Sequence, residues 1–172
     1  NTLFPYTTLF RSGIDPGSRI TGYGIIDHDG REMRYVTCGV VRAGNGDFPL
    51  RLRTIYEAVM ELAETYRPDM AAVEQVFIQR NPDSALKLGQ ARGAAICGCV
   101  AGNVAVAEYT PRAIKQAVVG KGGADKSQVQ YMMRVLLKLP AAPSEDAADA
   151  LAVAVCHAHH LGQQAAGLAG AR

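Results

Sequence analysis

The sequence predicts an α/β domain in which a mixed five-stranded sheet carries helices on both faces. Short apolar segments and longer amphipathic segments follow one another in the order βββαβαβααα, without internal repeats, and this alternation is typical of helices packed on a sheet. The 172 residues are 48% hydrophobic and 20% charged, which fits one globular domain with a single core. These fractions exclude a disordered chain and a collagen-like repeat. Four cysteines spread over the chain exclude a disulfide-stapled miniprotein.

The first half of the chain predicts four strands and one helix. Apolar residues at spacings of three and four between residues 48 and 66 form one face of a helix, which Pro68 ends. The first strand ends at the Asp15-Pro16-Gly17 turn, and Asp29-Gly30 is typical of a hairpin turn. The other three strands are predicted at residues 20–27, 33–41 and 70–74.

The second half predicts the fifth strand and four further helices. Asp83 or Ser84 can cap a long helix that continues to about Val100, and a proline in the first turn favours another helix from Pro111. The glycine-rich residues 120–123 form a loop. The remaining elements are predicted as a strand at residues 104–107 and helices at residues 111–119, 125–139 and 144–161.

Residues 1–12 do not join well to the strand that follows. They resemble the conceptual translation of a common sequencing adapter, so we interpret them as a non-native segment left by gene assembly. A natural extension is the alternative. If the segment is non-native, Leu9, Phe10 and Arg11 replace the original start of the first strand, where apolar strand residues are expected. This replacement predicts a weakened first strand. The predicted organisation is a single domain at residues 13–161 and a flexible C-terminal tail at residues 162–172.

The longest apolar stretch, residues 94–107, is too short to span a membrane. Gly98, Gly102 and Asn103 interrupt it, and a spanning helix needs roughly 20 apolar residues. The N-terminus also lacks the basic and apolar regions of a secretion signal. We therefore expect a cytoplasmic protein with reduced thiols.

Cys97 and Cys99, together with Cys156 near three histidines, raise the question of a zinc site. Two cysteines two positions apart on a helix point about 200° away from each other. The histidines lie at a helix end, before a tail rich in Gly, Ala and Gln. Buried cysteines and a solvated helix end are the preferred interpretation, with zinc as the alternative.

The formal net charge of +2 hides a charge gradient along the chain. Residues 1–79 carry 8 Lys and Arg against 10 Asp and Glu, residues 80–138 carry 9 against 3, and residues 139–172 carry 1 against 3. The middle segment is therefore at +6 and each flank at −2. A basic segment between two acidic ones predicts a polyanionic partner held next to a carboxylate site.

The last predicted helix carries two carboxylates on one face. Nine of the ten residues from Ala147 to Cys156 are Ala, Leu, Val or Cys, and the exception is Asp149, so this segment is predicted to be buried all round. Asp146 lies one turn earlier, and residues 139–171 contain no Lys or Arg to pair with either acid. Unpaired buried carboxylates are costly, which predicts a cation supplied from elsewhere. For Asp146 the alternative is an acid that complements the helix dipole.

Two further carboxylates end predicted core strands. Asp15 follows the first strand and Glu74 closes an apolar run, so both lie at carboxyl ends of strands, where α/β sheets form their functional crevice. A turn residue is the alternative for Asp15. Together with Asp146 and Asp149 they would form an oxygen-only site, which matches hard cations such as Mg²⁺ or Mn²⁺. Two such ions per subunit, about 3.5–4 Å apart, would suit in-line attack on a phosphodiester.

Four segments of the chain resemble the RuvC family of Holliday junction resolvases. They read GIDPGSRITGYGIID, AAVEQVFIQRNPDSALKLGQARG, YTPRAIKQAVVGKGGADKSQVQ and EDAADALAVAVCHAH, and the resemblance extends in register from Gly13 to about His160. It implies a ribonuclease H-like fold and a homodimer. It also implies a metal-dependent endonuclease that nicks two strands of like polarity across four-way junction DNA.

The resemblance further implies roles for individual residues. The family's acidic site corresponds to four residues of this chain: Asp15, Glu74, Asp146 and Asp149. The two family lysines near the scissile phosphate correspond to Lys115 and Lys126, and the aromatic residue that stacks on an unpaired base corresponds to Phe77. The family favours a thymine-containing core sequence at the cut and works with the RuvA–RuvB branch-migration complex.

The basic middle segment predicts contacts to DNA phosphates. For Lys115 and Lys126, taken singly, the alternative is a solvated helix face. Phe77 is either a core residue, if the strand of Glu74 continues, or a stacking residue worth ~1–3 kcal/mol to an unpaired base, if the strand ends at Gln75. Further candidates for DNA contacts are Arg80, Lys87, Arg92, Arg112 and Lys121.

A stripe of small residues recurs every four positions along the long helix predicted after Asp83. Its members are Ala85, Gly89, Gly93 and Cys97. Small side chains allow another helix to approach closely, and each glycine otherwise costs about 1 kcal/mol of helix stability. A dimer contact and close packing on the protein's own sheet are equally good interpretations.

Two other functions compete with the resolvase hypothesis. One is a catalytically silent junction-binding module. The other is a fragment of an actin-like phosphotransferase, a class that also begins with a strand ending in Asp but needs two such domains. Gly120–Ser127 nearly matches a phosphate-binding P-loop, but Asp125 replaces the glycine before the lysine and a helix precedes the loop, which excludes that motif.

Overall fold

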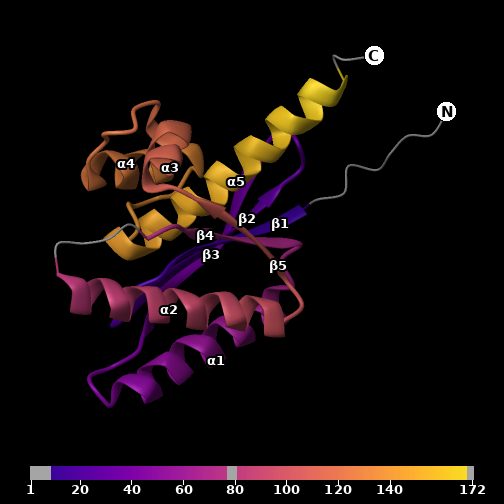
Figure 1. The fold of residues 1–172 in the computed structure, drawn as a ribbon. Helices are drawn as coiled ribbons and strands as arrows, with labels where there is room; N and C mark the ends of the chain where they lie inside the picture. The colour runs from indigo at the N-terminus through magenta and orange to yellow at the C-terminus, as the bar shows by residue number, and fades with distance from the viewer. Residues whose placement is uncertain (1–8, 77–80, 170–172) are drawn as a thin grey trace.

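The computed structural model describes residues 9–76 and 81–169, with the side chains of the last helix described to residue 162. Five strands form one mixed sheet in the order β3-β2-β1-β4-β5, which confirms the predicted architecture (Figure 1). β1 pairs antiparallel with β2 and parallel with β4, while β3 is antiparallel to β2 and β5 is parallel to β4. The strands are β1 (Leu9–Asp15), β2 (Ile20–His28), β3 (Met33–Arg42), β4 (Met70–Glu74) and β5 (Ala105–Tyr109).

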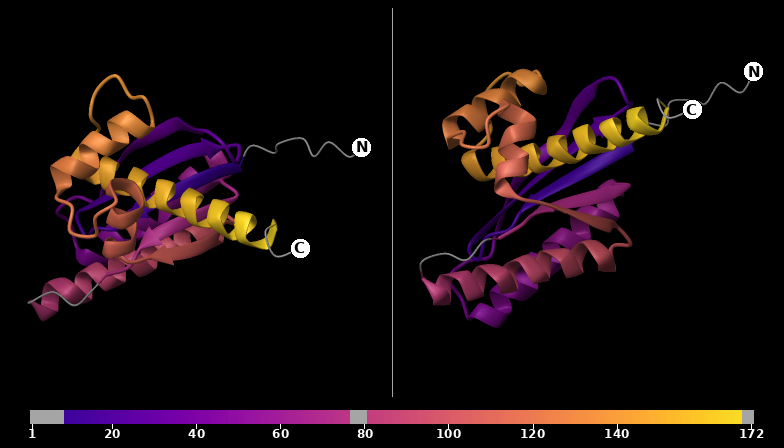
Figure 2. Two further views of the ribbon diagram at one scale, coloured as in Figure 1. Left: turned by 90° about the horizontal axis from the view of Figure 1, so that it is seen from above. Right: turned by 45° about the horizontal axis from the view of Figure 1, so that its top comes forward.

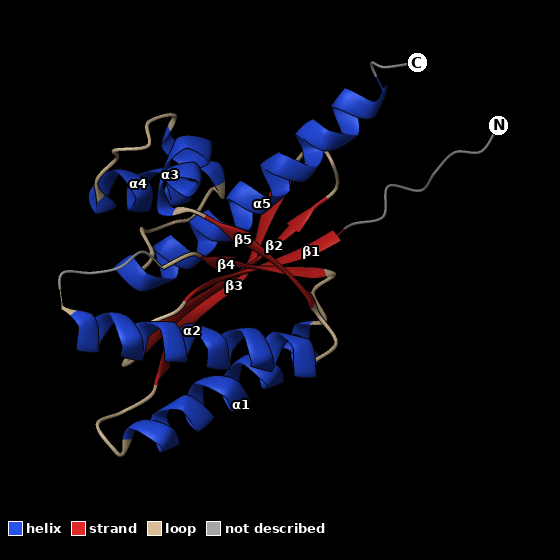
Figure 3. Ribbon diagram, viewed as in Figure 1, coloured by secondary structure: helices blue, strands red, loops and turns tan. Residues whose placement is uncertain are grey.

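Helices cover both faces of this sheet (Figures 1 and 3). α1 and α2 pack together on one face, and α5 crosses the other face over β1 and β2. α3 and α4 pack against α5 and form a separate lobe above it (Figure 2). The helices are α1 (Phe48–Tyr66), α2 (Pro82–Ala101), α3 (Pro111–Val119), α4 (Lys126–Leu136) and α5 (Glu145–Ala169).

α5 lies close to the sheet because two residues beneath it have no side chain. A Cβ added at Gly13 or at Gly22 would lie 2.1 Å from a backbone oxygen of α5, and backbone cannot move aside as a flexible side chain can. The helix itself contributes small residues, and residues 147–158 are buried except for the half-buried Asp149, as the apolar run predicted. The start of α5 is thereby fixed over β1 and β2.

The start of α2 differs from the predicted cap. Asn81, and not Asp83 or Ser84, is the N-cap: its side chain accepts hydrogen bonds from the backbone N–H groups of Asp83 and Ser84. Pro82 occupies the first turn, where its missing N–H is no loss. The cap therefore lies before the proline.

Other boundaries shift by a few residues, most of all at the C-terminal end. α5 continues to Ala169, past the predicted end at residue 161, because most of the residues that follow are Ala, Gln and Leu, which favour a helix. Most of the segment predicted as a flexible tail is therefore helical. α4 is shorter than predicted, with Asp125 as its N-cap in a capping box with Gln128, and β5 begins and ends later than predicted.

β1 begins at Leu9 and so includes residues 9–12 of the segment interpreted as non-native. Arg11 lies two residues from Gly13, on the face covered by α5, and is only 5% exposed. Its Nη1 donates to the carbonyl oxygen of Phe10 at 3.3 Å and lies 3.9 Å from Oδ2 of Asp69, but its Nε is buried without a hydrogen-bond partner. Burial lowers the pKa of Arg11. A cation thus occupies a position where the sequence pattern predicts an apolar side chain.

His157 of α5 is buried in the same core. Its Nδ1 lies 2.8 Å from the hydroxyl oxygen of Tyr109, and its Nε2 has no hydrogen-bond partner. Burial, followed by the positive charge of Arg11, lowers the pKa of His157 to about 4. The folded protein therefore holds this imidazole in its neutral form at physiological pH.

We expect the buried His157 to make the fold sensitive to acid. Between its ordinary pKa of about 6.5 and the lowered value, the unfolded chain binds a proton that the folded chain does not, so stability falls as pH falls through this window. Urea unfolding at pH 7 and pH 4.5 measures the effect. His157→Gln, which can still pair with Tyr109, should lose less stability over this interval than the wild type. His159→Gln on the same helix is the control, and equal losses in all three proteins would contradict this assignment.

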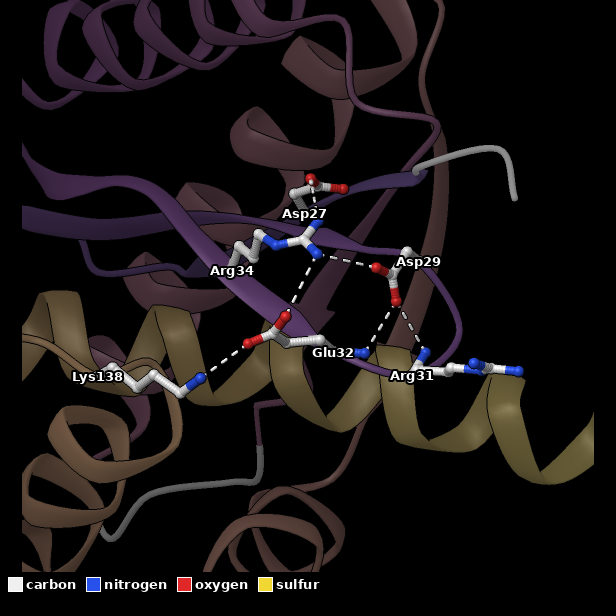
Figure 4. A network of polar contacts seen from close by, with 6 residues as sticks. All are labelled: Asp27, Asp29, Arg31, Glu32, Arg34 and Lys138. Carbon is white, nitrogen blue, oxygen red and sulfur yellow. Dashed lines mark hydrogen bonds and ion pairs between the residues drawn. The ribbon is translucent and has the colours of Figure 1, made fainter. Parts of the chain in front are cut away.

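Charged side chains tie the β2–β3 hairpin together and connect it to the lobe (Figure 4). Arg34 lies at the centre, with Nη2 3.1 Å from Oδ2 of Asp29 and 3.3 Å from Oε2 of Glu32, and Nη1 3.8 Å from Oδ2 of Asp27. Lys138, which follows α4, places its Nζ 2.8 Å from Oε1 of Glu32. The residues after α4 are thus connected to the β2–β3 hairpin by an exposed ion pair, worth at most about 1 kcal/mol.

Within residues 9–76 and 81–169, no helix has both the length and the apolar character needed to cross a membrane. All four cysteines of the chain are free. Cys97 is exposed and Cys99 is buried, so they lie on different faces of α2, as their spacing predicted, but the interpretation as buried cysteines is wrong for Cys97. The two thiols therefore do not share a site.

Candidate active site

An open cleft lies where the carboxyl ends of β1 and β4 meet. Asp15 is the last residue of β1 and Glu74 the last residue of β4, and the two strands are adjacent and parallel. The cleft has a volume of about 440 Å³ and is lined on one side by these acids and by Asp149 of α5. Lys115 of α3 and Lys126 of α4 line it as well. The structure thus gathers three of the four predicted acids and both predicted lysines around one cleft.

Asp15 and Glu74 both line the cleft, and each influences the pKa of the other. Burial raises the pKa of Asp15 to about 9, and the neighbouring charges of Glu74, Asp149 and Asp146 add to this rise. Burial also raises the pKa of Glu74, although the hydrogen bond from Asp15 and the charges of Lys115 and Lys126 oppose the rise. The pair is a crowded negative site that lacks a sufficient counter-charge.

α5 contributes the other two acids from its first two turns. Asp149 is 21% exposed, and burial raises its pKa while the charge of Lys126 opposes that rise. Asp146 is half-buried; it does not line the cleft, but its charge raises the pKa of Asp15 and of Asp149. The two carboxylates therefore belong to one electrostatic unit with Asp15, as their spacing on the helix predicted.

The cation expected for these acids comes from the start of α4. Lys126 places its Nζ 3.7 Å from Oδ2 of Asp149, and it also pairs with Oε1 of Glu145. These partners raise the pKa of Lys126, with the Glu145 hydrogen bond as the largest cause. Glu145 was not among the predicted site residues. Its position next to Asp146 was a possible signal, but its partner lies on another helix, which the sequence pattern does not reveal.

The remaining residues predicted to contact DNA lie on the lobe, on α2 or outside the described residues. Arg112 and Lys121 are exposed on the lobe that also carries Lys115 and Lys126. Lys87 lies on α2 and pairs with Asp83 one turn earlier, at 2.8 Å. Arg92, also on α2, is mostly buried, and its guanidinium contacts Glu74 and Glu108. Two candidates, Phe77 and Arg80, lie outside the described residues.

The donor set of the cleft fits a hard divalent cation. Among the described residues, no three or more His, Cys, Asp or Glu side chains are arranged so that they could hold a metal ion. The carboxylate oxygens of Asp15, Glu74 and Asp149 are nevertheless the ligands that Mg²⁺ and Mn²⁺ prefer. The raised pKa of Asp15 marks a concentration of negative charge that a cation would neutralise. Among the described residues that line the cleft there is no Cys or His, the side chains that zinc sites mostly use.

Comparison with known proteins identifies the family. The model of the family described as crossover junction endodeoxyribonuclease RuvC matches residues 12–157. The chain belongs to the RuvC family. RuvC of Alkalilimnicola ehrlichii is 61% identical over 153 residues, which cover 89% of this chain and 93% of that protein. RuvC of Yersinia pestis is 58% identical over 147 residues, covering 86% and 85%. RuvC enzymes are nucleases that hydrolyse phosphodiester bonds.

Solved structures of the RuvC family share the fold described above. Thermus thermophilus RuvC in complex with a Holliday junction substrate matches with a TM-score of 0.85 at 34% identity, covering 91% of this chain and 96% of that chain. The yeast mitochondrial Holliday junction resolvase Ydc2 matches with a TM-score of 0.60 at 13% identity, which supports the fold alone. The predicted ribonuclease H-like fold is thereby confirmed.

Proposed function

We propose that this protein resolves Holliday junctions by cutting two DNA strands of like polarity with the help of divalent metal ions. The observation that carries the proposal is the cleft in which Asp15, Glu74 and Asp149 face Lys115 and Lys126, in a chain of the RuvC family. Acids for cations and lysines for phosphates are the two requirements of metal-assisted phosphodiester cleavage. Recombination and repair of DNA in the cytoplasm are the setting that this activity implies.

The four acids would hold the metal. Asp15, Glu74 and Asp149 line the cleft, and Asp146 supports them from the adjacent turn of α5. Mg²⁺ is the proposed ion, with Mn²⁺ as a substitute and two ions per subunit; metal dependence is general in the RuvC family. When bound, the ions supply an activated water and stabilise charge on the scissile phosphate. The chain's own part is to fix the acids at the ends of β1, β4 and the first turns of α5.

The lobe of α3 and α4 would bind the DNA backbone at the cleft. Lys115 and Lys126 line the cleft together with the acids, and Arg112 and Lys121 are exposed on the same lobe. Lysines next to the scissile phosphate would neutralise the negative charge that develops on it during cleavage. Stacking of Phe77 on an unpaired base, contacts from Arg80 and Lys87, and a thymine-containing core at the cut complete the proposal; these parts are supported by the family resemblance.

A homodimer would supply the second active site that paired nicks need. Leu86 and Val100 on α2 are 65% and 60% exposed, and the two glycines of the stripe, Gly89 and Gly93, have open space where a Cβ would stand. The stripe of small residues therefore faces away from the protein's own sheet. This supports the dimer interpretation, because a second copy of α2 can approach such a face closely. The RuvA–RuvB complex is the further partner that the family resemblance implies.

A cleavage assay on two DNA substrates tests the proposed function. The purified chain is incubated with Mg²⁺ and either a synthetic four-way junction or a linear duplex of the same sequence. We expect paired nicks in the junction and at least tenfold slower cutting of the duplex. Junction binding without cleavage would favour the silent binding module instead. Equal cutting of both substrates would contradict structure-selective resolution.

Binding of Mg²⁺ should also be visible without DNA. An ion that binds only the folded protein raises its melting temperature, by roughly 2–4 °C for each kcal/mol in a domain of this size. We expect Mg²⁺ to raise Tm of the wild type and to have a much smaller effect on Glu74→Gln, which loses one charged ligand. NaCl at the same ionic strength is the control. An equal rise in both proteins would place the ion elsewhere.

A further inference from the structure

Arg92 reaches the end of β4 from the side of the sheet opposite to the cleft. Its Nε donates a hydrogen bond to the carbonyl oxygen of Glu74 at 3.1 Å, and its Nη2 lies 2.5 Å from Oε1 of Glu108. The side chain is 20% exposed and does not line the cleft. One guanidinium therefore connects α2 to the ends of both β4 and β5.

The register of the sheet shows which face each side chain near the end of β4 occupies. Glu74 pairs with Tyr109, whose hydroxyl contacts His157 of α5, so these side chains lie on the α5 face. Val73 pairs with Glu108, and Val73 packs into the core beneath α1 and α2. Arg92 thus acts on the backbone of Glu74 from behind, while the Glu74 side chain points into the cleft.

This backbone contact lies at the carboxyl end of β4. Glu74 is the last residue of the strand, and the backbone N–H of Gln75 donates to the carbonyl oxygen of Tyr109 of β5 at 2.8 Å. Strand ends open more easily than strand centres. A side chain that holds the carbonyl of Glu74 therefore limits the directions in which its carboxylate can move.

We propose that Arg92, held by Glu108, is a positioning residue for Glu74 and not a contact to DNA. The proposal rests on the proposed function, because positioning matters only if Glu74 serves in cleavage. An arginine suits the task because its planar guanidinium donates in two fixed directions, toward the Glu74 carbonyl and toward Glu108, whereas the single ammonium of a lysine cannot reproduce this fork. Partners that orient a ligand typically change activity by about 10–100-fold when they are lost.

The central test is Arg92→Lys, which keeps the charge but loses the fork. We expect the cleavage rate of bound junction to fall by about tenfold or more, and the Mg²⁺ concentration for half-maximal cleavage to rise. Junction affinity without divalent metal should stay within about twofold of the wild type. Arg53→Lys on α1, whose exposed side chain pairs with Glu57, is the matched control and should cleave normally. Normal cleavage by Arg92→Lys would overturn the proposal.

Two further variants separate positioning from DNA binding. Arg92→Gln removes the charge, so a phosphate contact would make the salt dependence of junction binding shallower by about 0.9 in log–log slope. Positioning predicts an unchanged slope with slow cleavage. Glu108→Gln keeps Arg92 and is safer for folding because Glu108 is 42% exposed; it should also slow cleavage, and a normal rate would contradict the role of Glu108. If wild-type protein does not cleave, the proposed function fails; if it cleaves and the variants cleave equally well, only the positioning role fails.

Discussion

Replacing Glu74 by glutamine will remove junction cleavage and leave junction binding intact. Glu74 lines the cleft, and its carboxylate pairs with that of Asp15 on the neighbouring strand. An amide of the same shape keeps the packing but lacks the charge that holds a divalent ion. We expect cleavage to fall by at least about a hundredfold, the size of effect seen when one stabilising group is lost from an active site. Cleavage of a labelled junction at saturating enzyme measures the chemical step separately from binding.

Asp149→Asn should behave in the same way, because Asp149 lines the same cleft from α5. Its junction binding should equal or exceed that of the wild type, since Lys126 loses one of its two acidic partners and becomes more available to phosphate. Glu61→Gln, an exposed acid on α1, is the control for an acid-to-amide change. Cleavage at the wild-type rate by either active-site variant would refute the proposed acidic site.

Replacing Arg11 by leucine will stabilise the fold. Arg11 is buried beneath α5 with an unpaired Nε, and its charge contributes to the lowered pKa of His157. Exchanging poorly compensated buried charge for apolar side chains of similar volume is often stabilising by about 1–4 kcal/mol. Asp69, its partner at 3.9 Å, is half exposed and keeps its hydrogen bond from the backbone N–H of Phe10. Thermal unfolding should therefore show Tm raised by roughly 2–4 °C for each kcal/mol gained.

Arg53→Leu on the exposed surface of α1 is the control for this substitution. Because the Arg53 side chain is 67% exposed, its loss should change Tm little. The leucine variant should also retain more of its stability at pH 4.5, since the positive charge beside His157 is gone. An unchanged or lower Tm for Arg11→Leu would show that the site has adapted to its arginine.

The local sequence pattern was enough to predict a helix that is buried on all sides. The alanine-rich run after Asp146 predicted a buried helix, and α5 is buried along that run because Gly13 and Gly22 leave room for it. The cap of α2 was mispredicted although its signal was present: an Asn directly before a Pro in the first turn is a good N-cap pair. The end of α5 was mispredicted because the Gly-, Ala- and Gln-rich residues after 161 predict a flexible tail, whereas the helix continues to Ala169.

The acids of the site were predictable and their partners were not. Asp15 and Glu74 end apolar strands, and that placement is readable from the sequence alone. Arg92 and Glu108 meet only through the register of β4 and β5 against α2. Glu145 meets Lys126 only because the lobe packs on α5. Contacts of this kind depend on how elements pack together, and an ion pair such as Lys138 with Glu32 joins residues 106 positions apart.

The four acids are spread from the first strand to the last helix, which has a consequence during protein synthesis. Asp15 lies in the first strand, whereas Asp146 and Asp149 lie in the last helix, and that helix rests directly on the first two strands. A polypeptide whose translation stops before residue 146 carries the basic segment 80–138 but lacks half of the acids. On the proposed function, an unfinished copy would therefore be unable to cut DNA, because the proposed acidic site is complete only when the whole domain has been synthesised and has folded.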